Sequence, residues 1–163
     1  MENLHPAARE RVLHVLAGCT DLTLATIRPD GSPQATAVSF VNRGLAIYAG
    51  IGLDSQKAHN IQRCGRVSLA LNLPYADWGH ILGISAAASA AIVSGGDALA
   101  SVEDAMILKF PQIEAIRARG QAAGWGSLVV IRIVPHIISL LDYSKGFGHT
   151  ELYAVQPGAI GEA

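Results

Sequence analysis

The residues from Gln34 to Asn72 constrain the fold of this chain more than any other stretch. They comprise two segments of alternating apolar and polar residues, a glycine-broken loop, a helical segment that starts near Ser55, and a further alternating segment. The start of a helix presents unpaired backbone N–H groups and the positive end of the helix dipole. We therefore predict an anion site beside a sheet, where a phosphate meets these N–H groups, the Ser55 hydroxyl and the Lys57 ammonium.

Alternating segments on both sides of this stretch extend the predicted sheet. An Asp30-Gly31 turn joins the first two strands, and an Asn-Arg-Gly turn joins the second to the third. Such short turns connect antiparallel neighbours. We expect six strands, at residues 22–28, 34–41, 45–49, 67–73, 80–94 and 127–141.

Two of these strands are predicted against a local signal. The alanines within residues 80–94 favour a helix by propensity, but the β-branched residues there and the Gly95-Gly96 stop favour a strand. Pro135 lies inside the last strand, where it has no N–H to donate. We therefore expect a bulge or kink at Pro135.

The remaining segments favour helices and loops. Pro6 and Gly18 are typical of the first turn and the end of a helix, and Asp97 or Ser101 can cap a second one that runs to Leu108. At 163 residues the chain is most simply one domain. We predict a single domain over residues 1–163, with an N-terminal helix within 1–18, a short helix at 112–119, a loop at 120–126 and a loose tail at 156–163.

Charge and hydropathy exclude several classes of partner. Twelve basic and thirteen acidic residues give a net charge of −1 without a basic run, which argues against nucleic acid and anionic membranes. No segment has the ~18 apolar residues of a membrane span, and the first residues do not resemble a secretory signal, so we expect a cytoplasmic protein. A hydrophobic fraction of 50% against 15% charged residues favours a homodimer that buries the excess.

The sequence gives little indication of a metal site or of a catalytic nucleophile. The two cysteines are far apart, and the six histidines are scattered singly, without the spacing of a metal site. No Ser/His/Asp set or carboxylate pair has a defensible spacing, so no catalytic residue is assigned. Any enzyme chemistry is expected to come from a bound cofactor.

Four segments resemble, in order and spacing, the flavin-binding split-barrel family related to pyridoxamine 5′-phosphate oxidase. They are LATIRPDGSPQATAV, SQKAHNIQ, PYADWGHILG and LDYSKGFGH. The resemblance covers most of the chain, from Pro6 to Tyr153. It implies a mainly β fold, an antiparallel, Greek-key-like split barrel with peripheral helices. It also implies a homodimer that binds flavin mononucleotide (FMN) across its interface and acts on a small molecule.

The resemblance also implies which residues contact the cofactor. The second strand would follow the isoalloxazine ring, the third strand would line the ribityl chain, and the helix start would hold the phosphate. Trp78 and Trp125 either stack on the flavin of the partner subunit or anchor the dimer interface. The cofactor residues implied in this way are Gln34, Thr36, Ala37 and Ser39 for the ring, Tyr48 and Ala49 for the ribityl chain, and Ser55, Gln56 and Lys57 for the phosphate.

Three of these residues depart from the family pattern. Gln34, Ser39 and Gln56 stand where the oxidases commonly carry arginine, lysine and arginine. The arginine-rich C-terminal signature is also replaced, by residues 144–149. These departures argue against pyridoxamine phosphate as the substrate. Two hypotheses stay open: an FMN-dependent oxidoreductase with an unknown small-molecule substrate, and a non-catalytic protein that binds or senses flavin, a deazaflavin or haem on the same barrel.

Overall fold

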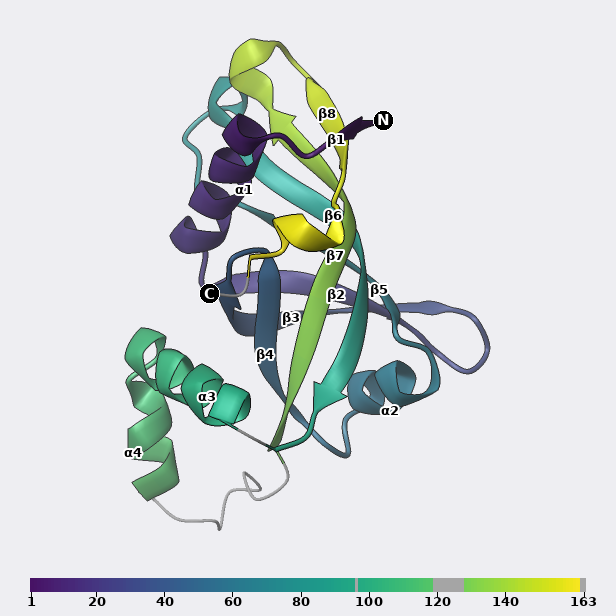
Figure 1. The fold of residues 1–163 in the computed structure, drawn as a ribbon, viewed down its shortest axis with the longest axis vertical. Coiled ribbons are helices and arrows are strands. Elements are labelled where there is room, and N and C mark those ends of the chain that lie inside the picture. The colour runs from purple at the N-terminus through teal and green to yellow at the C-terminus, as the bar shows by residue number, and fades with distance from the viewer. Residues whose placement is uncertain (96, 119–127, 162–163) are drawn as a thin grey trace.

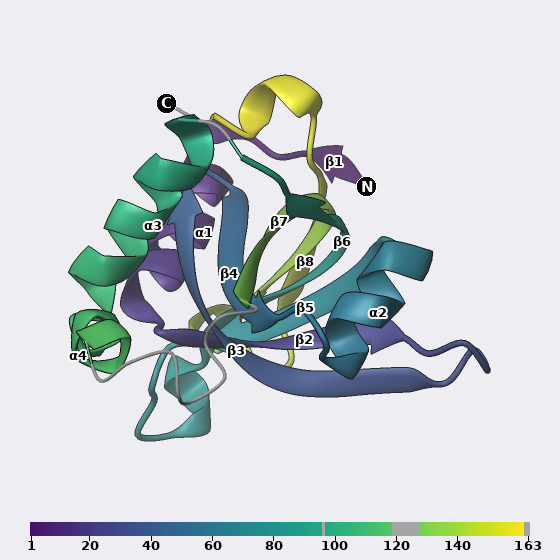
Figure 2. The ribbon, with the colours of Figure 1, turned by 90° about the horizontal axis from the view of Figure 1, so that it is seen from below.

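Six antiparallel strands close into a barrel (Figures 1 and 2). The computed structural model describes residues 1–95, 97–118 and 128–161. Around the barrel the order is β7, β4, β3, β2, β5 and β6, and β6 pairs back to β7. The mainly β, antiparallel split barrel predicted from the sequence is confirmed, with small shifts at the strand ends. The barrel strands are β2 (Asp21–Ile27), β3 (Pro33–Arg43), β4 (Ala46–Gly52), β5 (Arg66–Asn72), β6 (Leu82–Val93) and β7 (Leu128–Asp142).

Two short strands extend the sheet beside β7. β8 (Thr150–Ala154) pairs antiparallel with the second half of β7, and β1 (Glu2–Asn3) pairs in parallel with β8. The first half of β7 pairs with β4 instead. β7 therefore changes its neighbour on one side midway, while β6 follows it on the other side along most of its length. The edge of the barrel between β7 and β4 is therefore open beside the second half of β7, where β8 pairs instead.

The long β6–β7 ladder contains the bulge expected at Pro135. Ala87 pairs with Ile137, but Ala88 pairs with Pro135, so His136 has no partner on β6. Because proline cannot donate a ladder hydrogen bond, the bulge places it where none is required. The alanine-rich segment is confirmed as a strand, because its pairing on both sides outweighs the helix propensity of alanine.

Four α-helices lie outside the strands in the described part of the chain. The first begins after His5, whose Nδ1 accepts a hydrogen bond from the N–H of Ala8 at 3.2 Å, and it packs Val12 and Leu16 against the barrel core. The helix expected within residues 1–18 begins at Pro6, and the residues Glu2–Asn3 before it form β1. On the opposite half of the barrel, α2 lies on one side and the α3–α4 pair on the other (Figures 1 and 2). The helices are α1 (Pro6–Gly18), α2 (Gln56–Arg63), α3 (Asp97–Lys109) and α4 (Gln112–Ala118).

None of the helices that the structure describes is long and apolar enough to cross a membrane. The predicted loop at 120–126 lies outside the described residues.

The C-terminal tail is held against the barrel. The N–H of Leu45 donates a hydrogen bond of 2.8 Å to the carbonyl oxygen of Ile160, and Ile160 is only 8% exposed. Gly44 permits this contact, because it has a φ of +53° and a Cβ there would collide with the same carbonyl oxygen. The expectation of a loose tail is therefore wrong for residues 156–161. The last two residues lie outside the described part of the chain.

A cluster of charged side chains ties α1 to β7 and β8. Arg11 forms an ion pair with Asp142 and lies 3.7 Å from Glu151. Lys145 Nζ donates to Glu151 Oε1 at 2.7 Å, and His149 Nε2 lies 3.3 Å from the same oxygen. The hydrogen bond from Lys145, followed by that from His149, lowers the pKa of the Glu151 carboxyl to about 2.

The fold is expected to lose stability as the pH falls from 4.5 towards 2, in part through Glu151. A carboxyl with a lower pKa in the folded state contributes stability that is complete above its unfolded pKa and is lost as the pH falls to the folded value. Acid unfolding followed by circular dichroism should therefore show a shallower loss for Glu151→Gln than for the parent chain. The same pH dependence in both proteins over this range would contradict the assignment.

Candidate functional site

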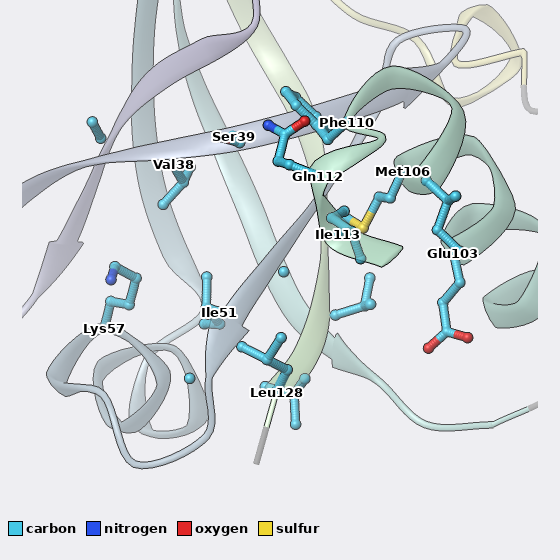
Figure 3. Close-up of a pocket in the computed structure, with 16 residues that line it drawn as sticks. Val38, Ser39, Ile51, Lys57, Glu103, Met106, Phe110, Gln112, Ile113 and Leu128 are labelled. Atoms are coloured by element: carbon cyan, nitrogen blue, oxygen red, sulfur yellow. The ribbon is translucent and has the colours of Figure 1, made fainter. Parts of the chain in front are cut away.

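A pocket of about 460 Å³ opens on the outer side of β3, β4 and β7, between α2 and the α3–α4 pair (Figure 3). Its floor carries small side chains, namely Ala37 and Ser39 of β3 with Gly50 and Gly52 of β4. Strand alternation places both glycines on the outer face, and a Cβ added at Gly50 would meet no atom within 4 Å. The floor therefore consists of backbone and small side chains, which a planar ring can approach closely.

An apolar wall from the helices faces this floor. Met106 is on α3, Phe110 directly follows the end of that helix, and Ile113 is on α4. Figure 3 shows these three side chains on the same side of the pocket, opposite α2. Together with Leu128 of β7 they offer an apolar surface over a ring system.

Lys109, the last residue of α3, connects the apolar wall of the pocket to the barrel, and we call these contacts the clamp. Lys109 Nζ donates a hydrogen bond of 2.8 Å to the carbonyl oxygen of Cys19 and lies 4.2 Å from the ring centre of Phe40 and 5.7 Å from that of Phe110. Burial at this position lowers the pKa of the Lys109 ammonium. Because Phe110 lines the pocket, the clamp also fixes the position of the wall.

Lys57, in the first turn of α2, is the one residue of that helix in the described lining of the pocket, and Ser55, directly before the helix, lies outside this lining. Ser55 caps the helix, since its hydroxyl accepts a hydrogen bond from the N–H of Ala58 at 3.3 Å and donates one to the carbonyl oxygen of Gly52 at 2.6 Å. The only other charged residue in the described lining besides Lys57 is Glu103, and Figure 3 shows these two on opposite sides. No hydrogen bond or ion pair joins the Lys57 ammonium to any residue within the described ranges. A helix start with an unpartnered lysine is suited to an anion.

The predicted cofactor residues divide between the two faces of β3. Ala37 and Ser39 lie on the pocket side with Lys57, and the Ser39 hydroxyl donates to Asp21 at 2.5 Å. Gln34 and Thr36 lie on the other face, because side chains alternate along a strand. The Thr36 hydroxyl is buried there and has no hydrogen-bond partner among the described residues.

The other predicted contacts lie outside the lining of this pocket. Tyr48 and Ala49 are buried in the barrel wall, and Gln56 is exposed and bonded to Asn60. Trp78 lies apart from the pocket and is 66% exposed, and Trp125 is not among the residues that the structure describes. Whether these residues contact a cofactor stays a prediction.

Sequence reasoning missed the helical wall. Residues 97–119 were assigned only as helices, although Val102, Met106 and Phe110 recur every four residues and indicate an apolar face. What that face covers depends on contacts with β3, which are distant in sequence. The glycines at 50 and 52 were assigned to a loop, whereas they belong to the end of β4.

The pocket offers few ligands for a metal. Its described lining contains no histidine and no cysteine, and Met106 contributes the only sulfur there. No group of three His, Cys, Asp or Glu residues within the described ranges could hold a metal ion.

Comparison with known families identifies the chain. The family model for pyridoxamine 5′-phosphate oxidase matches residues 8–141, which is most of the sequence. The chain belongs to the pyridoxamine 5′-phosphate oxidase family. A search among curated proteins finds no match.

Solved structures share the barrel of this pyridoxamine 5′-phosphate oxidase family member. A conserved hypothetical protein from Mycobacterium tuberculosis is 26% identical, with a TM-score of 0.71 over 87% of this chain and 89% of its own. A haem-binding protein from Mycobacterium smegmatis is 20% identical, with a TM-score of 0.74 over 96% of this chain. This chain spans only 61% of that protein. HutZ, a haem storage protein from Vibrio cholerae, is 17% identical, with a TM-score of 0.63 over 93% of this chain and 94% of its own.

Proposed function

We propose that this chain is an FMN-dependent oxidoreductase that acts on a small molecule in the cytoplasm. The observation that carries the proposal is the ammonium of Lys57, which has no partner among the described residues and lies beside the start of α2, at the side of a largely apolar pocket with small side chains on its floor. Such a pocket combines an anion site with a surface for a planar ring. These two features would match the phosphate and the isoalloxazine ring of FMN. The ring would lie over Ala37, Ser39 and Gly50, and the phosphate would meet Lys57 and the first N–H groups of α2.

The protein's own part would be to bind, orient and shield. A bound flavin would supply the redox chemistry, which no side chain in the described lining of the pocket provides. Gly50 and Gly52 would let the ring approach the backbone, and Phe110 with Met106 would exclude water from its outer side. Ser39 is held by Asp21, so its orientation on the floor is fixed.

Haem is the alternative occupant that the similar structures raise, because two of them are described as haem-binding and haem-storage proteins. Haem iron requires an axial ligand, usually histidine, cysteine, tyrosine or methionine. In the described lining only the Met106 thioether could serve. The scarcity of axial ligands in the described lining therefore favours a flavin over haem.

A homodimer is part of the proposal, because the pocket floor continues into an exposed sheet face. Ala37 of β3 pairs with Thr23 of β2, which pairs with Ala70 of β5 and then Ser85 of β6. These small side chains are exposed or partly exposed. Such a face is flat enough for the same face of a second copy to pack closely against it.

Charges at the two ends of this face favour one orientation. Asp21 lies at one end and Arg66 at the other, and both are exposed. A two-fold axis that runs in the interface, across the strands, places each Asp21 opposite the partner's Arg66. Trp78, which packs on Phe147 with ring centres 5.8 Å apart, sits in the β5–β6 connection at the edge of the face and would contact the second copy.

Redox turnover tests the oxidoreductase proposal. After reconstitution with FMN, a nicotinamide donor is expected to bleach the flavin absorbance, and air is expected to restore it. Ser55→Ala with Lys57→Ala should weaken FMN binding by about 10- to 100-fold, the range expected for losing charge-assisted hydrogen bonds, while circular dichroism stays unchanged. Bound FMN that dithionite reduces and air restores, but that no nicotinamide donor bleaches, would instead indicate a binding protein.

A further inference from the structure

A buried carboxamide lies on α2, the helix that brings Lys57 to the pocket. Asn60 of α2 is 1% exposed and faces β2 and β3. Its Oδ1 accepts a hydrogen bond from Gln56 Nε2 at 2.9 Å, and its Nδ2 donates to Thr26 Oγ1 at 3.0 Å and to Gln34 Oε1 at 3.1 Å. Both amide hydrogens and the amide oxygen are thus used, as a buried amide requires.

The three partners come from three different places in the chain. Thr26 is on β2, Gln34 is on β3 and Gln56 is the first residue of α2. Asn60 therefore joins the first turn of the helix to the edge of the β2–β3 hairpin. Lys57 lies in that same turn, directly after Gln56, so the network also fixes the place from which its side chain extends.

The network also decides which polar groups remain for a ligand. The side chains of Gln34 and Gln56 point their amides at Asn60 rather than into the pocket, and neither residue is in its lining. Lys57 is the sole basic side chain in the described lining. The anion site depends on a single charge, and its strength depends on where that charge and the helix start are held.

We propose that Asn60 is the positioning residue of the anion site: its carboxamide holds Lys57 and the start of α2 against the β2–β3 hairpin so that both address a phosphate. Asn60 does not touch the ligand itself. This inference rests on the proposed flavin site and names what tunes its preference for a phosphorylated flavin.

The test compares FMN with riboflavin, which shares the ring and ribityl chain but lacks the phosphate. The ratio of their dissociation constants isolates the anion site, because a general loss of packing affects both ligands alike. We expect the parent chain to prefer FMN by about tenfold or more, the value of one good charge-assisted contact. Asn60→Ala and Lys57→Ala should each bring the ratio close to one, and the double variant should lower it no further.

A milder variant guards against misfolding of Asn60→Ala. Gln56→Met removes one hydrogen bond from an exposed residue, and it should lower the ratio about threefold. Gln62→Ala, an exposed position on the same helix, is the matched control and should leave the ratio unchanged. Folding of each variant is checked by circular dichroism before titration.

The outcomes separate this inference from the proposed function. Equal losses of FMN and riboflavin affinity in Asn60→Ala, or an additive loss of the ratio in the double variant, would show a purely structural role and overturn the inference alone. If Asn60→Ala does not fold, an unchanged ratio of the FMN and riboflavin dissociation constants in Gln56→Met would overturn the inference. A parent chain that binds neither flavin would overturn the proposed function, and the inference with it.

Discussion

Phenylalanine in place of Gly50 is expected to weaken FMN binding by at least about 100-fold, or about 2.8 kcal/mol. Gly50 lies in the floor of the pocket, and a Cβ there meets open space, so the new ring would enter the volume that we assign to the isoalloxazine. The fold should survive, because aromatic residues suit strands and the substitution creates no backbone clash. Fluorescence titration with FMN measures the loss.

The matched control for this substitution is Gly158→Phe. A Cβ at Gly158 also meets open space, but the residue is exposed in the C-terminal segment and outside this pocket. It should bind FMN as the parent does, with the same thermal unfolding curve. Normal FMN affinity in Gly50→Phe would show that the flavin does not lie over the floor of this pocket.

Arginine in place of Ala70 is expected to convert the proposed homodimer to monomers. Ala70 is exposed at the middle of the small-residue face, and two large charged side chains would meet where the second copy packs. The isolated barrel should remain folded, because the substitution points to solvent. Analytical ultracentrifugation gives the mass, and Gln62→Arg on α2 serves as a control of equal charge.

Charge reversal tests the orientation of the two copies. Asp21→Arg alone should weaken the dimer, and adding Arg66→Asp should restore it, since each residue is proposed to face the other across the interface. A parent chain that is monomeric, or an Ala70→Arg variant with the mass of a dimer, would remove this face from consideration.

Local patterns in the sequence predicted the strands and the helix start with good accuracy. Alternation in residues 34–41 reflects one buried and one exposed face, which is a property of the strand itself. The Ser55 cap and the bulge at Pro135 follow from the chemistry of single residues and their neighbours. These features depend on short-range physics, so the sequence displays them directly.

The parts that sequence reasoning missed depend on contacts between distant residues. Asn60 bonds to Thr26, 34 positions away, and the clamp of Lys109 on Cys19 spans 90. Neither pairing leaves a periodic signal. Gln34 and Ser39 were assigned to one ligand, yet alternation along β3 places them on opposite faces. The face that meets the pocket could be decided only once the barrel was closed.

Equilibrium binding of FMN to the purified chain tests the central claim most directly. Quenching of FMN fluorescence, with haem titrated in parallel, is predicted to show saturable uptake of one FMN per protomer, reduced in the Ser55→Ala and Lys57→Ala double variant. Haem should bind weakly, because the described lining of the pocket lacks histidine, cysteine and tyrosine. A chain that takes up haem with a Soret band and leaves FMN free in solution would contradict the proposed flavin site.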